Sequence, residues 1–424
     1  MRLFLACLFL SIGLFAADAT ITITKTVPTP FNIVVESKTG GASQIDKVVG
    51  NSIRVDLTTA GFFNVLNSPE GSSASLPFDS QIYQKAGLHY ILRYELSIKD
   101  TQLRMQAQVY DVKAKKILFS TKDPYTVTNA NNRHVFLAHH LIMDLADKMG
   151  IGGLDWMNRY VILARQTGKK ETEIMIADYT LQFRQRIVRG GFNVFPKWAD
   201  SKQTTFYYTH YEKKPTLYKV ELKTGIKTKI LDSEGMLVCS DVSKDGRKLL
   251  LTMADNDQPD IYEYDTITRK KTRLTNFRGI DVNGRYLEND ASFVFVTDRL
   301  GYPEIFYAKI ANPENAEQFI FKGRNNNYIT TCGDRAVFVS RDTASAFENN
   351  TFNLYLVSTK SNYMRQLTAT GKNNFPRFSR TCDTILHTKE IKRNKEGALA
   401  VIRLDYNKAP FMPTLEGSIQ SFDW

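Results

Sequence analysis

Three of the chain's six histidines lie within residues 131–150, and an aspartate follows the last of them by four positions. Imidazole and carboxylate groups are common zinc ligands, but a zinc ion needs three or four of them converging on one point. Whether His134, His139 and His140 can converge depends on the element that carries them.

The apolar residues of this stretch recur at the spacing of an amphipathic helix, which Asn131 or Asn132 could cap and Gly150 would end. Successive helical residues turn by about 100°, so the three imidazoles would point in different directions. His140 and Asp144 would form an exposed i,i+4 pair, of a kind that contributes only a few tenths of a kcal/mol. We therefore expect a structural helix, with no metal and no cofactor.

The N-terminus has the pattern of a secretory signal peptide. Arg2 precedes an apolar run, and an A-x-A cleavage motif follows at 17–19. The run is shorter than the roughly 20 residues of a membrane span, and no later segment is apolar for long enough. Residues 1–19 are predicted to be removed, leaving an exported chain that starts near Thr20.

Removing the signal peptide leaves three cysteines, Cys239, Cys332 and Cys382. An odd, widely spaced set is no disulfide framework, so we expect buried free thiols, with one bridge as the open alternative. The formal net charge is +12, but the basic residues are scattered among acidic ones. This distribution favours acidic partners or envelope surfaces over a nucleic-acid groove.

Residues 20–150 indicate a small α/β domain. Short strands are expected at "ATITIT", "FNIVVE" and "FFNVL", and a helix is expected in "SQIDKVVGNSIRVDLTTAG". Alternation from residue 89 to residue 127 predicts three further strands joined by tight turns. The segment "GIGG" after the histidine helix is the predicted linker.

Residues 151–424 contain a repeat. Stretches such as "PDIYEYD" and "FNLYLVS" recur, and their anchor positions are separated by 43, 44, 44, 49 and 45 residues. This spacing with four short strands per unit predicts a six-bladed β-propeller. The first unit lacks an inner strand, which Ser421–Trp424 would supply to close the ring. The anchors are Ile174, Leu217, Ile261, Ile305, Leu354 and Leu399.

The sequence lacks the motifs of common enzymes: it contains no G-x-S-x-G, H-E-x-x-H, C-x-x-C or P-loop. A binding scaffold is therefore the first interpretation. Two alternatives stay open, a propeller enzyme such as a metal-dependent hydrolase or lactonase, and a propeller that binds glycans.

Five loops lead into the predicted inner strands and would surround one mouth of the central channel. They are rich in Asn, Gly and Arg with aromatic residues between them, which suits a protein or peptide partner. The alternative is that Asn and Gly are simply good turn formers. The candidate contact residues are Phe192, Asn193, Met236, Cys239, Arg278, Asp281, Arg324, Asn327, Tyr328, Lys372 and Asn374.

Several stretches resemble the TolB family. "SKDGRK … DIYEYD … TRLT" and "FPRFSR … NLYLVS" resemble its P-x-W-S-P-D-G … I-Y … L-T repeats, although the S-P-D-G signature is altered in every blade. "FVFVTDRLGYPEIFYAKI" is similar to its central blades. "RHVFLAHHLIMDLADKMGIGG" resembles its R-x-x-A-H-x-x-A-D-x-I-x-x-x-L-T-G-x-x-G segment, matching at Arg133, His139, Asp144 and Gly150.

The resemblance implies a monomeric, non-enzymatic adaptor in the periplasm that supports outer-membrane integrity and constriction during cell division. Its propeller mouth would bind the peptidoglycan-associated lipoprotein Pal. Arg133, His139 and Asp144 would seat the histidine helix at the domain junction. An extended N-terminal segment would be offered to TolA by strand addition. That segment consists of Thr20, Ile21, Thr22, Ile23, Thr24 and Lys25.

Overall fold

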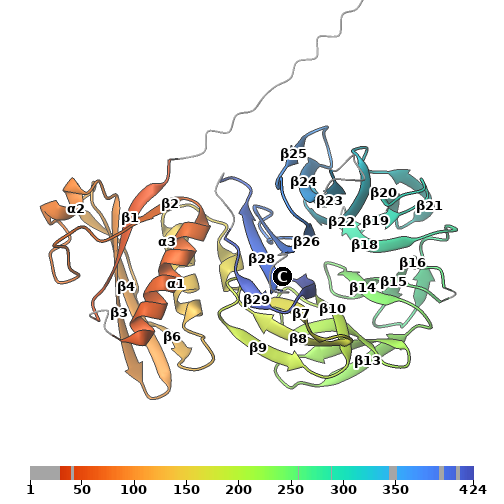
Figure 1. Ribbon diagram of the computed structural model, residues 1–424, viewed down its shortest axis with the longest axis horizontal. Coiled ribbons are helices and arrows are strands. Elements are labelled where there is room, and N and C mark those ends of the chain that lie inside the picture. The colour runs from red at the N-terminus through yellow and green to blue at the C-terminus, as the bar shows by residue number, and fades with distance from the viewer. Residues whose placement is uncertain are drawn as a thin grey trace, which may run out of the picture.

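The computed structural model has a smaller part built on one mixed sheet, followed by a ring of six four-stranded sheets (Figure 1). This arrangement confirms the predicted mainly β fold, a six-bladed propeller after an α/β domain. The signal peptide, the strand at "ATITIT" and the segment Thr20–Lys25 lie outside the described residues. The structure describes residues 29–39, 43–255, 257–287, 289–342, 351–390, 396–406 and 411–424.

The first part contains a six-stranded sheet. Its strands are β1 (Phe31–Ser37), β2 (Phe63–Leu66), β3 (Tyr90–Lys99), β4 (Gln102–Asp111), β5 (Lys116–Ser120) and β6 (Tyr125–Thr128). The order is β2-β1-β3-β4-β5, and β1 is parallel to both of its neighbours. Where three strands were predicted after residue 89 there are four, because the chain returns after β5 to pair β6 with another length of β4.

Two long helices accompany the sheet, and a short one, α2 (Gln81–Lys85), precedes β3. The first long helix, α1 (Gln44–Ala60), confirms the helix predicted from apolar spacing. It begins after Ser43, whose hydroxyl accepts a hydrogen bond from the backbone N–H of Asp46 at 3.2 Å. It ends at Gly61, whose φ of 94° requires a residue without a Cβ.

The second long helix, α3 (Val135–Lys148), carries the histidines, and it starts without the predicted asparagine cap. Asn131 and Asn132 instead adopt φ values of 54° and 57° in the preceding turn. Asn132 donates from its side chain to the carbonyl of Gln182 at 3.1 Å, so its amide serves a long-range contact. The predicted end is confirmed, because Gly150 has a φ of 71° just beyond the last turn.

The propeller strands form six antiparallel blades around a channel (Figure 1). Written from the innermost strand outward, blade 1 contains β30 (Ile419–Asp423), β7 (Val161–Gly168), β8 (Glu171–Ala177) and β9 (Arg184–Val188), and blade 2 contains β10 (Phe192–Trp198), β11 (Thr205–Tyr211), β12 (Pro215–Glu221) and β13 (Lys227–Asp232). Blade 3 contains β14 (Leu237–Val242), β15 (Lys248–Met253), β16 (Asp260–Asp265) and β17 (Lys271–Arg273), and blade 4 contains β18 (Asp281–Leu287), β19 (Ser292–Thr297), β20 (Glu304–Lys309) and β21 (Asn312–Gln318). Blade 5 contains β22 (Arg324–Cys332), β23 (Arg335–Arg341), β24 (Phe352–Ser358) and β25 (Met364–Gln366), and blade 6 contains β26 (Asn373–Phe378), β27 (Thr384–Glu390), β28 (Glu396–Arg403) and β29 (Thr414–Glu416).

The C-terminal strand closes the ring, as predicted. β30 pairs antiparallel with β7 of the first blade, placing Phe422 opposite Leu163 and Ser421 opposite Ala164. Phe422 is fully buried. A propeller closed in this way joins its first and last blades by backbone hydrogen bonds and leaves no open edge between them.

A disulfide links blades 5 and 6 and corrects the expectation of free thiols. Cys332, at the end of β22, bonds Cys382, in the turn between β26 and β27, with the Cα atoms 5.6 Å apart. The two residues are 50 positions apart but occupy neighbouring blades, which is why sequence spacing did not reveal the pair. Cys239 is the free, buried thiol of the described chain.

One hydrophobic cluster continues from the first part into the propeller. It includes Leu141 and Leu145 of α3, Trp156 of the short helix η1 (Asp155–Asn158) and Phe422 of β30, all completely buried. Burial of such a side chain contributes about 1.5–3 kcal/mol, so this shared core fixes the helix that carries the histidines against the propeller.

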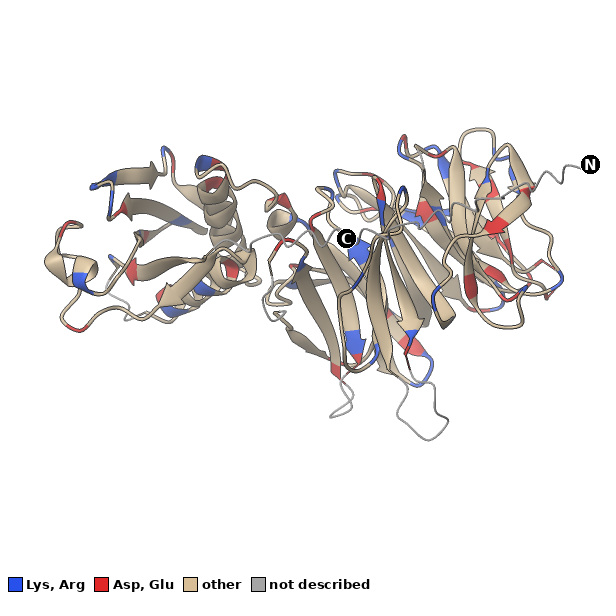
Figure 2. Cartoon of the chain, turned by 90° about the horizontal axis from the view of Figure 1, so that it is seen from above, with Lys and Arg blue, Asp and Glu red and all other residues tan. Residues whose placement is uncertain are grey.

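Basic and acidic side chains are interspersed over both parts of the chain (Figure 2). Among the described residues, none of the helices has both the length and the apolar character to cross a bilayer.

Candidate binding site in the propeller channel

The inner strands carry irregularities where they face the channel. The pairing of β10, β18, β22 and β26 with the next strand shifts register partway along. Within each shift lies a residue with positive φ, namely Phe195 (55°), Asn283 (57°), Tyr328 (45°) and Phe375 (50°). A bulge of this kind turns a side chain away from the regular alternation. All four residues line one cavity in the channel.

This cavity has a volume of about 430 Å³. Much of its wall is apolar, including Val238 and Val282 of blades 3 and 4. At its rim, Met236 and Ile280 are 42% and 47% exposed, although both are large apolar side chains. An apolar surface open to solvent in a concave site is typical of places where a partner binds.

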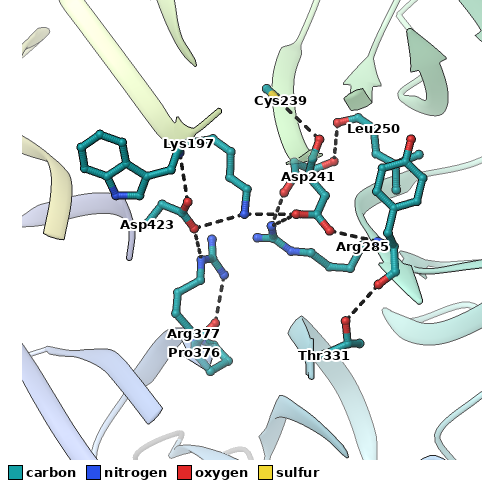
Figure 3. Close-up of polar contacts among 12 residues, drawn as sticks. Lys197, Cys239, Asp241, Leu250, Arg285, Thr331, Pro376, Arg377 and Asp423 are labelled. Atoms are coloured by element: carbon teal, nitrogen blue, oxygen red, sulfur yellow. Dashed lines mark hydrogen bonds and ion pairs between the residues drawn. The ribbon is translucent and has the colours of Figure 1, made fainter. Parts of the chain in front are cut away.

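Charged residues from different blades meet in the channel (Figure 3), and the three basic ones, Lys197, Arg285 and Arg377, line the cavity. We call this network the channel floor. Lys197 of β10 lies 3.1 Å from a carboxylate oxygen of Asp241 and 3.2 Å from one of Asp423. Arg377 of β26 contacts the same Asp423 oxygen at 3.1 Å, and Arg285 of β18 lies 3.5 Å from Asp241. Two carboxylates thus hold three cations, and the network ties blades 1, 2, 3, 4 and 6 together across the channel.

Asp241 and Arg377 of this network remain charged at neutral pH. Burial alone raises the pKa of Asp241, but Lys197 and Arg285 outweigh it and hold that pKa below its usual value. Burial, and then the like charge of Arg285, lower the pKa of Arg377 to about 10. Burial raises the pKa of the Cys239 thiol, so this thiol stays protonated and is a poor nucleophile.

Four of the predicted mouth residues line the cavity: Met236, Cys239, Asn327 and Tyr328. Tyr328 also stacks at a tilt on Phe375, with ring centroids 4.4 Å apart.

Two other predicted mouth residues are buried inside their blades. Asn193 is fully buried and donates to the carbonyls of Thr172 and Gly190 at 3.1 and 2.8 Å. Asp281 is also fully buried, and its carboxylate pairs with Arg299 at 3.1 Å. These two side chains hold neighbouring strands together, which is the structural alternative to binding.

Asn326 and Asn373 repeat the role of Asn193 in blades 5 and 6: both are fully buried and donate to a carbonyl of the preceding loop. The richness of these loops in asparagine, which suggested a binding surface, is therefore partly a feature of blade construction.

The remaining predicted mouth residues lie outside the cavity lining. Arg278 is exposed in the loop before β18, whereas Lys372 pairs with Glu390 at 3.1 Å. Phe192 packs on Tyr211, with centroids 5.7 Å apart.

Two further predicted residues lie in inner strands. Asn374 is half-buried in β26, and Arg324 is the first residue of β22, with its side chain outside what the structure describes.

The predicted junction residues have separate roles. His139 contacts Asp178 of blade 1, and the guanidinium of Arg133 lies 5.0 Å from the ring centre of Phe183, also of blade 1. Asp144 instead accepts a hydrogen bond from the hydroxyl of Tyr125 at 2.6 Å, within the first part of the chain. Two of the three thus face the propeller.

The predicted pair of His140 with Asp144 is wrong. The Nε2 atom of His140 lies 2.7 Å from the side-chain nitrogen of Asn158, on η1, and its Nδ1 atom lies 2.7 Å from the carbonyl of Phe136. His140 also stacks on the ring of Tyr125 in β6, with centroids 6.0 Å apart, so contacts with η1 and β6 replace the local pair. In the part of the chain that the structure describes, no three His, Cys, Asp or Glu residues are grouped to hold a metal ion.

Sequence reasoning missed the aromatic and basic residues that shape the cavity. A usable signal existed, since Phe195-Pro196-Lys197 and Phe375-Pro376-Arg377 repeat the order aromatic, proline, basic. In both copies the aromatic residue occupies the bulge and the basic residue reaches the central ion-pair network.

Comparison with known proteins agrees with this architecture. Residues 156–424 match the TolB beta propeller domain, and residues 19–118 match the TolB amino-terminal domain.

Several relatives are called "Tol-Pal system protein TolB", among them the following two. The one from Wolinella succinogenes is 40% identical and that from Helicobacter hepaticus 38% identical; the matches cover 97% and 99% of both chains, respectively. The crystal structure of TolB from Acinetobacter baumannii superposes with a TM-score of 0.76 at 22% identity, covering 93% of this chain and 96% of that one. The chain therefore belongs to the TolB family.

Proposed function

We propose that this protein is a non-enzymatic adaptor of the Tol–Pal system that works in the periplasm. Its channel mouth would bind the lipoprotein Pal, and Thr20–Lys25 would bind TolA. Residues 20–150 would form one domain and residues 151–424 the other. Through these contacts the protein would support outer-membrane integrity and constriction during cell division.

Family membership and the relatives' shared name support a place in the Tol–Pal system. The predicted signal peptide supports export.

The cavity at the mouth carries the binding proposal. Its exposed rim offers Met236 and Ile280 to a partner, above a floor of buried charges that are already paired. Association that buries such apolar side chains is driven by removal of their surface from water. The paired charges keep the floor rigid, so that little conformational freedom is lost on binding. A protonated thiol and carboxylates that are held in ion pairs favour a recognition surface over a reactive one.

The test is a binding titration with the periplasmic domain of Pal. Ile280→Asp and Met236→Asp each place a charge on the apolar rim without altering the blades. We expect each to weaken binding by at least about thirtyfold, corresponding to about 2 kcal/mol for a central contact. Ile267→Asp is the matched control, because Ile267 is 72% exposed in a turn of blade 3 and should leave the affinity unchanged. If Ile280→Asp and Met236→Asp bind Pal with the same affinity as Ile267→Asp, the channel mouth is not the Pal-binding site.

TolA binding has its own test. A mature chain lacking residues 20–25 should lose binding to TolA while keeping its affinity for Pal. If the shortened chain still binds TolA as the full chain does, the N-terminal assignment is wrong.

A further inference from the structure

A second concave site lies between the two parts of the chain, away from the channel mouth. It is a crevice of about 650 Å³, lined by residues of β6 and α3 on one side and by blade residues on the other. The blade residues include those of the β10–β11 turn, at the opposite end of β10 from the loop that leads in from the mouth.

Four cations line this crevice, and each comes from a different segment. Arg133 precedes α3, Arg159 follows η1, Lys202 lies in the β10–β11 turn, and Arg380 lies in the β26–β27 turn. No aspartate or glutamate is among the described residues that line it. This composition is unusual in a chain whose charges are otherwise interspersed.

The contrast with the channel is informative. In the channel floor, every cation is held by a carboxylate. In the crevice, the Arg159 guanidinium donates to a backbone carbonyl, that of Ser201, at 3.0 Å, and Arg133 lies over the ring of Phe183. Neither contact neutralises a positive charge. Burial, and then the like charge of Arg380, lower the pKa of Arg159.

Three carboxylates beyond the lining act on Arg159: Asp155 most strongly, then Asp423 and Asp200. The last two are committed elsewhere. Asp200 accepts hydrogen bonds from the backbone N–H groups and hydroxyls of Thr204 and Thr205. Asp423 belongs to the channel network. Asp155 offsets part of the charge of Arg159, but three further cations line the crevice and its described lining holds no carboxylate, so net positive charge remains for a ligand from outside the chain.

We propose that this crevice binds a phosphate-bearing ligand that bridges the two parts of the protein. Neighbouring guanidinium groups call for more than one negative charge in a compact group. A phosphate carries about −1.5 to −2 at neutral pH, whereas a carboxylate carries one. Arginine also matches phosphate oxygens with paired N–H donors. This site is independent of Pal binding and goes beyond the proposed adaptor role.

The experiment titrates the mature chain with inorganic pyrophosphate at low ionic strength by calorimetry. We expect saturable binding with one ligand per chain, together with a higher thermal midpoint, because a ligand that binds the folded form stabilises it. Arg380→Gln and Lys202→Gln should each weaken binding about tenfold, as loss of one charge-assisted contact does. Both residues are exposed, so neither change should unfold the protein.

Arg269→Gln is the matched control, since Arg269 is an exposed arginine in a turn of blade 3. Unchanged affinity in Arg380→Gln, or an equal loss in Arg269→Gln, would overturn the proposal. Citrate binding as tightly as pyrophosphate would overturn its phosphate preference.

A second arm distinguishes the source of the phosphate. The chain is floated with vesicles of phosphatidylglycerol and phosphatidylcholine, and with vesicles of phosphatidylcholine alone. Flotation that requires phosphatidylglycerol and is lost in Arg380→Gln would assign a lipid headgroup. Pyrophosphate binding without flotation would assign a soluble phosphate compound.

Discussion

His139 of α3 and Asp178 of blade 1 form an ion pair between the two parts of the chain, with Nε2 and the carboxylate oxygen 3.4 Å apart and both side chains fully buried. The other ring nitrogen lies 2.7 Å from Asp56 of α1, which also accepts a hydrogen bond from Tyr179 at 2.5 Å. His139, which could have suggested a metal site, thus links α3 to α1 through Asp56 and to the propeller through Asp178.

This arrangement predicts a stability that depends on pH. Burial alone lowers the pKa of His139, but Asp56 and Asp178 outweigh it and raise the pKa to about 9. In the unfolded chain the value is about 6.5. Because the folded value is higher, the charged imidazole stabilises the protein fully below pH 6.5, and this contribution is lost as the pH rises through about 9. Calorimetry from pH 6 to pH 10 should show the thermal midpoint falling over that window.

The matched variants isolate the imidazole from other titrating groups. His139→Gln should flatten the pH profile between pH 6.5 and pH 9, whereas His89→Gln, at an exposed position, should keep the wild-type profile. Parallel profiles for wild type and His139→Gln would contradict the assignment.

Deleting residues 419–424 should destabilise the whole propeller. The deletion exposes the edge of β7 and removes the Asp423 carboxylate that holds Lys197 and Arg377. Arg377 is then left without its carboxylate, whereas Lys197 keeps Asp241. Breaking one such buried pair costs about 3–5 kcal/mol, a large part of the 5–15 kcal/mol that holds a typical domain folded. Circular dichroism should show a lower, broader thermal transition, and a synthetic peptide of residues 417–424 should restore it. A truncated chain with the wild-type midpoint would count against closure by β30.

Reducing the disulfide should cost about 2–4 kcal/mol, because the bond between Cys332 and Cys382 restricts the unfolded chain. Urea unfolding with and without reductant measures the loss. Cys239→Ser should respond to reductant as the wild type does, while the double variant Cys332→Ser/Cys382→Ser should not respond. Thiol titration of the folded mature chain should detect no reactive thiol until it unfolds, and a count of three would refute the bond.

Stability and binding should separate at the predicted mouth. Asn193→Ala leaves the buried carbonyls of Thr172 and Gly190 without their donor, which costs about 1–3 kcal/mol. The affinity of the folded fraction for Pal should stay unchanged, whereas Ile280→Asp should lose affinity at wild-type stability. Asn374→Ala, at a half-buried neighbour position, controls for the loss of an amide. If Asn193→Ala loses as much affinity for Pal as Ile280→Asp does, Asn193 is part of the binding surface after all.

The sequence alone determined the number of blades and the two long helices. The repeat spacing identified six blades, and the final residues resemble the missing inner strand of the first blade, because strand alternation is a local property of side-chain order. The helical turn angle separated His134, His139 and His140 for the same reason, since neighbours on one helix share a fixed geometry.

Only the tertiary structure decided which residues meet. His139 contacts Asp178 because α3 packs against blade 1, and Cys332 bonds Cys382 because blades 5 and 6 are neighbours. No local period of the sequence relates these segments. The positive φ of Phe195 and Phe375 turned those side chains into the channel, where alternation alone would have left their direction open. Local patterns specify which face of an element is apolar, whereas long-range packing selects the partners that make a site.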